Sequence, residues 1–391
     1  MSHLTRNVFV GGPPGQRQEE NSWVLTALHG DETLITHFAA FSVAKAYFAR
    51  LYEQPWLLTE ATQDYGKALQ QLNSSLERST SATFARHLVA MFLLVFYELL
   101  CPTSHAGLYY HYSGIETLIH SQSPIFYQTQ PNLGYFMQAR VLIISGALLS
   151  SKKTFLAEHD WKVIPWSGET FKSLYHEIWD HLCDVATLLE EFENLTSTKG
   201  KDVAACGLFS NTVDKKIDTI ESWRRRWDGQ NCGKVLHVGI DWRQTLLPRV
   251  DPIANVSSAL TYANQQCARE SMLYYTALLY LYWMAAKCQT QLQSPATSHV
   301  NLERCSSRCG LHHVTWQIIL SVDYLMMSSR VKAGMSFLTL AADAMLRCYK
   351  SADWLIDMLM RMADISGYGF FRQLLKDHIP HAISAHRLTH L

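Results

Sequence analysis

The sequence lacks the short motifs on which the commonest nucleotide-dependent and hydrolytic enzymes are built. It contains no G-x-x-x-x-G-K-[ST] phosphate loop, no G-x-G-x-x-G, no G-x-S-x-G and no H-E-x-x-H. These patterns position phosphates, a dinucleotide, a nucleophilic serine or a zinc ion. Their absence argues against those chemistries but leaves room for an enzyme that needs no cofactor, and we expect no cofactor.

An excess of charge of one sign is also lacking. The 391 residues include 34 Lys and Arg against 34 Asp and Glu, so the net charge is +0. Because chains that bind nucleic acid by themselves usually carry a basic excess, we expect no direct contact with nucleic acid. Hydrophobic residues make up 48% and aromatic residues 12%. This composition supplies a large core and favours apolar small molecules or protein partners.

Paired cysteines, a secretory signal and long apolar runs are lacking as well. The nine cysteines are scattered, with no C-x-x-C, so we expect neither a disulfide framework nor a zinc site. The N-terminal sequence has no apolar signal region, and the longest apolar run, Met272–Ala286, is too short to cross a bilayer. We expect an intracellular protein, in the cytoplasm or nucleus, with no membrane span. His386 and His390 have chelating spacing, but we expect no metal there.

Helical periodicity dominates what the sequence does contain, and strand-type alternation is nearly absent. The pattern predicts an all-α protein with roughly ten to thirteen helices in a single large multi-helix body. We expect a disordered tail over 1–22, the helical body over 23–375 and a His-rich C-terminal tail over 376–391. A subdivision is expected near 196–210. Residues 257–293 are predicted to form one very long helix.

Five segments carry a further pattern. They are Asp64–Leu72, Leu88–Leu100, His111–Ile119, Phe155–Trp166 and Ala341–Met360, and Ser321–Tyr324 adds a shorter match. In composition, order and spacing they resemble the fungal-specific transcription factor domain, which is the ligand-responsive middle region of fungal zinc-cluster regulators. The run FLAEHDWKVIPW is the closest match, and the resemblance covers roughly residues 30–370. It implies an all-helical body that binds a small molecule.

The chain departs from that family in one respect. Such regulators carry six cysteines that hold two zinc ions, a basic linker and a coiled coil ahead of this domain. Here the first cysteine, Cys101, already lies inside the domain. We therefore expect a ligand-sensing body that acts without its own DNA-binding zinc cluster.

Two hypotheses of function follow. The first is a stand-alone protein of fungal secondary metabolism that binds an apolar polyene or terpenoid in an aromatic pocket. Such a pocket folds a flexible ligand into a reactive conformer without a cofactor. This fits isomerisation or cyclisation, including Diels–Alder-type cycloaddition. The alternative is a transcriptional regulator or co-regulator without a zinc cluster, which would pair with itself or with a helical partner protein.

Polar residues inside apolar helices are the candidates for catalysis. Tyr97 and Glu98 end one such helix and Arg140 lies within another. We expect Glu98 either to pair with an arginine, for which Arg140 is a natural partner, or to cap a turn. The further alternative is that Glu98 and Arg140, buried together, polarise a ligand carbonyl. His111 lies among tyrosines. It is either a hydrogen-bonded structural side chain or an acid–base group.

Aromatic residues supply most candidates for substrate binding. The candidates are Tyr109, Tyr112, Tyr275, Tyr282, Trp283 and Asp343. Tyr275 and Tyr282 are seven residues apart and therefore share one face of a helix. They form either core with hydroxyls at its edge or an apolar sleeve with a few hydrogen-bond donors.

Overall fold

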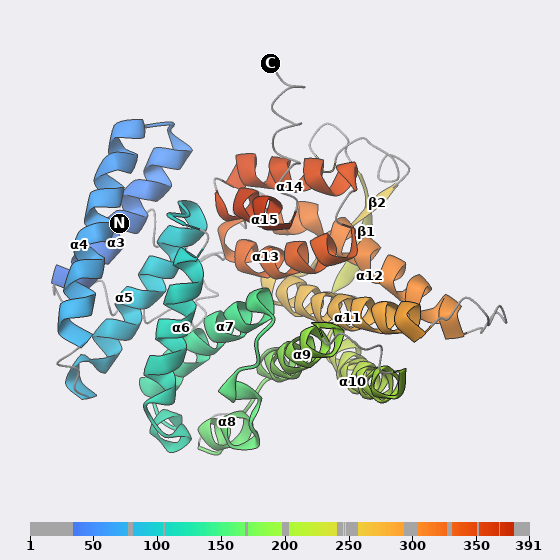
Figure 1. The fold of residues 1–391 in the computed structure, drawn as a ribbon. Helices are drawn as coiled ribbons and strands as arrows, with labels where there is room; N and C mark the ends of the chain where they lie inside the picture. Colours follow the sequence, from blue (N-terminus) through green and yellow to red (C-terminus); the bar gives the residue numbers. More distant parts are fainter. Residues whose placement is uncertain are drawn as a thin grey trace.

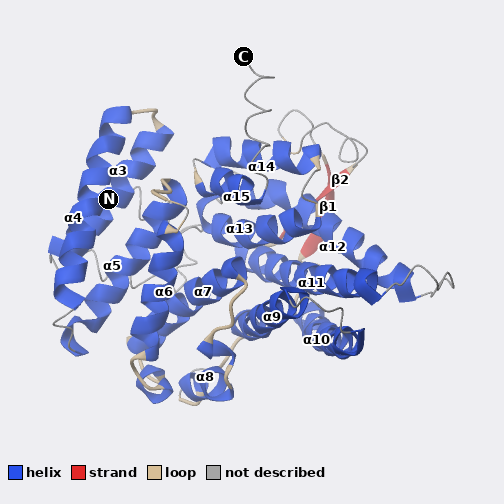
Figure 2. Ribbon diagram, viewed as in Figure 1, coloured by secondary structure: helices blue, strands red, loops and turns tan. Residues whose placement is uncertain are grey.

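The computed structural model describes most of the chain between residues 34 and 378. The described residues are 34–76, 81–104, 106–168, 171–197, 203–240, 245, 247, 257–292, 303–326, 331–349, 352–366 and 368–378. Within them the chain forms thirteen α-helices, three short 3₁₀-helices and one two-stranded sheet (Figures 1 and 2). The prediction of an all-α body is confirmed. The tail expected at 1–22 lies outside the described residues, as do His386 and His390.

The first five helices form one side of the molecule. They are α3 (Leu34–Leu51), α4 (Pro55–Leu76), α5 (Ser81–Leu100), α6 (Gly107–His120) and α7 (Asn132–Ser150). Figure 1 shows α3 and α4 side by side at one edge, with α5 and α6 between them and α7. Pro55 is the first residue of α4, where a proline is tolerated because its missing N–H would have no partner in the first turn. In this half the helices follow one another from the α3–α4 pair at the edge of the molecule to α7 near its centre (Figure 1).

An aromatic connector follows α7. It consists of η4 (Phe155–Ala157), α8 (His159–Val163) and η5 (Ile164–Trp166), and another short helix, η3 (Pro124–Tyr127), precedes α7. Trp161 is 5% exposed and meets the Phe155 ring edge-on at 4.5 Å between centroids. Packed aromatic side chains therefore hold this connector against the body in place of a regular helix.

The second half surrounds one long buried helix. Its elements are α9 (Leu174–Ser197), α10 (Val203–Gln230), β1 (Val235–Gly239), β2 (Ser258–Tyr262), α11 (Gln265–Leu292), α12 (Glu303–Met326), α13 (Val331–Cys348), α14 (Asp353–Ser366) and α15 (Phe370–His378). Strands β1 and β2 pair antiparallel, with Val235 opposite Tyr262. Helix α11 packs against α9, α10, α12 and α13. Its position explains why its middle is apolar on every side. The subdivision expected near 196–210 stays a prediction; α9 ends at Ser197, and α10, which packs against it, begins at Val203.

Two boundaries differ from the sequence prediction. The helix expected over 257–293 begins only at Gln265, because residues 258–262 pair with β1. The tail expected over 376–391 begins as helix, because α15 continues to His378. In both cases a long-range contact decides the local structure. The apolar periodicity of one segment does not reveal which distant segment it will contact.

Two helices are long and apolar enough to cross a membrane by length and composition alone. They are Thr83–Leu100 in α5 and Asn132–Ser150 in α7. Inside the fold 78% and 67% of these windows are buried. Because the core helices of a folded body pass the same test, the two are weak evidence for a membrane span.

Candidate functional site

A hollow of about 330 Å³ lies where the two halves of the molecule meet. Its lining residues are Tyr109, Leu149, Ser150, Asp343, Arg347, Leu374, Asp377 and His378. They come from α6, α7, α13 and α15, which converge near the centre of Figure 1. Two predicted substrate-binding residues, Tyr109 and Asp343, are therefore brought together at one site. The site mixes two leucines with ionisable side chains, as ligand sites commonly do.

Asp343 is the centre of the hollow's polar contacts. Its carboxylate is 2% exposed and accepts hydrogen bonds from Tyr280 Oη at 2.6 Å and Arg347 Nε at 2.8 Å. His378 Nε2 lies 2.9 Å from its other oxygen. Burial alone would raise the pKa of Asp343, but Arg347, His378 and Tyr280 hold it below the usual value. The carboxylate is therefore ionised at neutral pH.

Arg347 is fixed from several sides. Its Nη1 donates to Ser151 Oγ at 3.0 Å and lies 3.7 Å from a carboxylate oxygen of Glu193. The guanidinium also lies 5.7 Å from the ring centroids of Tyr280 and Trp283. Trp283 is a predicted substrate-binding residue. It contacts the Arg347 guanidinium instead and does not line the hollow.

Tyr109 offers a neutral phenol to the hollow. The side chain is half-buried. Burial, together with the negative charges of Asp343 and Asp377, raises its pKa to about 12. The hydroxyl therefore keeps its proton across the physiological range, and a phenol in this state can donate to a ligand oxygen.

The arrangement suits proton transfer better than nucleophilic attack. A buried carboxylate that holds an imidazole by one nitrogen fixes its tautomer and orientation, and the other nitrogen can then exchange a proton. Ser150 also lines the hollow, but its Oγ donates to the carbonyl oxygen of Gly146 at 2.7 Å. No hydrogen bond joins Ser150 to His378 within the described residues, so Asp343 and His378 have no activated serine beside them.

A second polar group gathers three of the predicted catalytic residues around a residue that was not predicted, Tyr65. Tyr65 Oη donates to Glu98 Oε1 at 2.6 Å and lies 2.9 Å from His111 Nε2. Its ring stacks on Tyr97 with centroids 4.3 Å apart. Glu98 also accepts from the backbone N–H of Thr103 at 2.9 Å and from its hydroxyl at 2.5 Å. Three donors therefore satisfy a carboxylate that is 1% exposed.

This group lies on the side of α6 away from the hollow. His111 and Tyr109 are two residues apart on that helix, so their side chains point in nearly opposite directions. Burial lowers the pKa of His111 to about 4, so the imidazole is neutral at pH 7. Glu98 packs so closely on Gly107 that a Cβ there would lie 2.7 Å from Glu98 Oε2. The group is a packed internal network that ties α4, α5 and α6 together.

The predicted pair between Glu98 and Arg140 is wrong. Arg140 is 1% exposed, forms an ion pair with Asp180 and donates to the backbone oxygen of His176 at 3.0 Å. It lies on the face of α7 that packs against α9, whereas Glu98 faces α4 and the start of α6. The apolar sequence around Arg140 predicts correctly that this charge is buried and has a partner. Which partner it reaches depends on the side of α7 on which it lies.

The remaining predicted substrate-binding residues pack elsewhere. Tyr112 lies against Gly146, where a Cβ would come 2.7 Å from Tyr112 Cβ. Tyr275 is 8% exposed and reaches Gln317 Oε1 at 3.5 Å. Tyr282 packs on Gly310 of α12. None of the three lines the hollow.

The functional residues that the sequence did not reveal are Arg347 and His378 in the hollow and Tyr65 in the internal network. Arg347 follows Asp343 by four residues on one helix, a spacing that predicts an ion pair. His378 belongs to the His-rich segment that was assigned to a tail. Nothing in the sequence around His378 indicates that its ring contacts Asp343. No group of three or more metal-ligating side chains is present among the described residues.

No family model, curated protein or solved structure matches this chain. The chemistry of the site therefore rests on its own geometry.

Proposed function

We propose that this chain is a cofactor-independent isomerase or cyclase that rearranges a small, largely apolar metabolite in the hollow. The observation that carries the proposal is the contact of the partly exposed His378 with the buried Asp343, beside the protonated Tyr109. Acid–base groups within one small site can shift a double bond or promote ring closure with no net change in mass. The volume, about 330 Å³, lies at the lower end of the range for small-molecule sites.

Each side chain has a distinct role in the proposed reaction. Tyr109 donates a hydrogen bond to a carbonyl oxygen of the ligand and stabilises the enolate that forms. His378 removes a proton from the carbon next to that carbonyl and returns it at another carbon. Asp343 holds the imidazole and stabilises its charged form, as a carboxylate partner does for a catalytic histidine. Leu149 and Leu374 supply the apolar wall against which the carbon skeleton lies.

The biological setting rests on the resemblance to the fungal transcription factor domain. That resemblance suggests a ligand-binding body from fungal secondary metabolism, and it also supports the alternative of a regulator without its own zinc cluster. The two functions use the same hollow. They differ in whether the ligand leaves it changed.

The test is product analysis after the purified protein is incubated with extracts of the source organism, with native mass spectrometry of the complex. We expect a bound metabolite to be released with unchanged mass and altered connectivity. His378→Gln and Tyr109→Phe should each slow turnover by about 10²- to 10⁴-fold, which is the usual contribution of one acid–base group. His313→Gln, on an exposed ring of α12, is the matched control and should leave the rate unchanged.

Two outcomes would contradict the proposed reaction. A metabolite that binds and is released unaltered would favour the regulator. Equal rates for wild type, His378→Gln and Tyr109→Phe would remove the hollow from the chemistry.

A further inference from the structure

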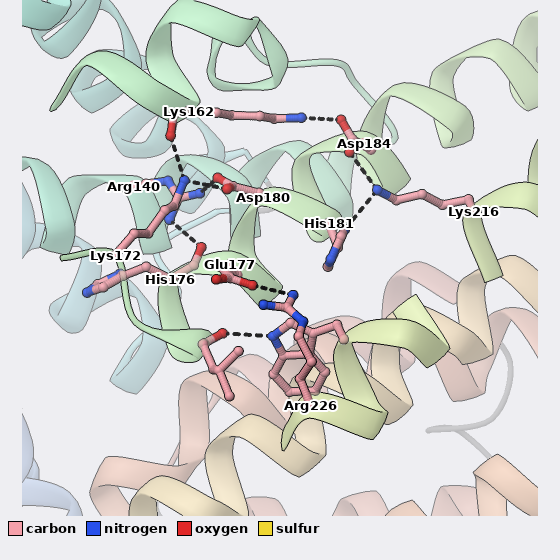
Figure 3. A network of polar contacts seen from close by, with 12 residues as sticks. Arg140, Lys162, Lys172, His176, Glu177, Asp180, His181, Asp184, Lys216 and Arg226 are labelled. Carbon is pink, nitrogen blue, oxygen red and sulfur yellow. Dashed lines mark hydrogen bonds and ion pairs between the residues drawn. The ribbon is translucent and has the colours of Figure 1, made fainter. Parts of the chain in front are cut away.

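A second cluster of charges lies along α9, apart from the hollow (Figure 3). We call it the α9 cation cluster. It comprises Asp180 and Asp184 on α9 and the cations Arg140, Lys162, Lys172 and Lys216. The cations come from α7, α8, the segment before α9, and α10. Four segments of the chain thus direct positive charge at one helix.

Each carboxylate of the cluster is shared between two cations. One oxygen of Asp180 contacts Arg140 and the other contacts Lys172. Asp184 contacts Lys162 through one oxygen and Lys216 through the other, the latter at 2.6 Å. Among the described residues these cations contact no other carboxylate, so two positive charges are left without a counter-charge.

The neighbouring histidines do not change this balance. Burial and the charges of Arg140 and Lys172 lower the pKa of His176 to about 3. His181, 3.0 Å from Lys216 Nζ, has its pKa lowered to about 3 by burial and by that same lysine. Both rings are therefore neutral at pH 7. Glu177, the next acidic residue on α9, already pairs with Arg226 at 2.6 Å.

Three nitrogen atoms in the cluster are buried without a hydrogen-bond partner within the described part of the chain. They are Arg140 Nε, His176 Nδ1 and Trp166 Nε1. The three residues are neighbours: the centroid of the Trp166 ring lies 4.6 Å from that of the His176 ring and 5.8 Å from the Arg140 guanidinium. Lys172 Nζ lies 5.2 Å from the same ring. Buried polar atoms without a partner are costly, and here they coincide with the charge surplus.

We propose that the α9 cation cluster binds a phosphate group. A phosphate carries close to the two negative charges that the cluster lacks, and its oxygens accept several charge-assisted hydrogen bonds at once. The side chains of Lys162, Lys172 and Lys216 are 19%, 15% and 13% exposed, so an anion can approach them from solvent. A single carboxylate would offset only half of the surplus.

The experiment is isothermal titration calorimetry of the full chain with inorganic phosphate, at an ionic strength kept constant with sodium chloride. We expect one saturable site. Lys172→Met keeps the aliphatic stem over Trp166 but removes a charge, and it should weaken binding at least about tenfold. Lys172→Arg should restore most of the affinity. Arg226→Met is the matched control, because Arg226 is 55% exposed and its charge is balanced by Glu177; its affinity should stay within about twofold of the wild-type value.

A second titrant distinguishes the source of the phosphate. Tighter binding of phenyl phosphate than of inorganic phosphate would identify a phosphorylated organic ligand, whereas the reverse order would identify the free ion, and both support the site. Circular dichroism shows whether each variant is folded, and Lys216→Met replaces Lys172→Met if the latter is not. No heat above that of chloride in the wild type, or equal losses in Lys172→Met and Arg226→Met, would overturn the proposal.

Discussion

The hollow and the α9 cation cluster surround carboxylates in different ways; Asp343 is 2% exposed, whereas Asp180 and Asp184 are 18% and 36% exposed. In the hollow Asp343 takes one guanidinium, one phenol and one imidazole. In the cluster Asp180 and Asp184 are each shared by two cations. The first arrangement places a proton-exchanging ring on a carboxylate, and the second leaves positive charge in excess. Charge balance, more than the number of polar residues, is what distinguishes the proposed proton-transfer site from the proposed anion site.

The histidines of the two regions show the same contrast. His378 Nε2 lies 2.9 Å from a carboxylate oxygen of Asp343. His176 lies beside Arg140 and Lys172, which oppose a second proton. One residue type therefore faces a carboxylate in one region and two cations in the other.

The largest expected effect comes from removing a counter-charge in the cluster. Asp180→Asn leaves Arg140, which is 1% exposed, without its carboxylate. We expect a loss of about 3–5 kcal/mol in the free energy of unfolding, because an unpaired buried charge is strongly destabilising. Asp184→Asn is the control, since that residue is 36% exposed, and it should cost about 0–1 kcal/mol. Urea denaturation measures both, and equal costs would show that Arg140 does not depend on Asp180.

The hollow can be weakened through Tyr280, which is fully buried and donates to Asp343 at 2.6 Å. Tyr280→Phe removes that hydrogen bond and should cost about 1.5–3 kcal/mol, the range for bonds to charged groups. Phosphate binding at the cluster should not change. Urea denaturation and calorimetry on the same variant measure both quantities. A loss of phosphate affinity would mean that the two regions are coupled.

A glycine pair tests whether helix spacing shapes the hollow. Gly146→Ala puts a Cβ 2.7 Å from Tyr112, so α6 must move away from α7, and Tyr109 moves with it. We expect a loss of about 1–3 kcal/mol by overpacking and slower turnover. Gly66→Ala in α4 meets no atom within 4 Å and should add about 0.4–1 kcal/mol. The opposite sign in either variant, measured by thermal or urea unfolding, would contradict the packing described.

The smallest expected effect, counted per pH unit, is the change in the free energy of unfolding that is due to His176. Its folded-state pKa, about 3, lies below the ordinary 6.5, so between these values only the unfolded chain takes up the proton. Stability should therefore fall as pH falls from about 6.5 toward 3, by up to about 1.4 kcal/mol per pH unit for this one group. Urea denaturation at several pH values should give a shallower slope for His176→Gln. His313→Gln, on an exposed ring, should keep the wild-type slope, and a wild-type slope in His176→Gln would contradict the assignment.

The sequence predicts the helices well and the partners of charged residues poorly. The apolar composition of α5, α7 and α11, which continues around most of each helix, predicts that they are buried. It also places Tyr109 and Asp343 among the ligand candidates, and both line the hollow. It does not assign Arg140 to Asp180, forty residues away, because that contact depends on how α7 meets α9.

The helix α15 illustrates the same limit. The helix Phe370–His378 is short, and its last residue is a histidine like those that follow it in the chain. The sequence alone does not separate His378 from them. His378 becomes a site residue only because α15 packs on α13 and brings its ring to Asp343. A contact of this kind is a property of the assembled fold.

One titration tests most directly whether the chain holds two separate polar sites. Histidine ¹⁵N signals are assigned by comparing the wild type with His176→Gln and His378→Gln at pH 7, and inorganic phosphate is then added at constant ionic strength. The account predicts that the His176 signals move in a saturable way while those of His378 stay in place. Movement of His378 with His176 unaffected, or equal movement of both, would contradict the division into a proton-transfer hollow and an anion-binding cluster.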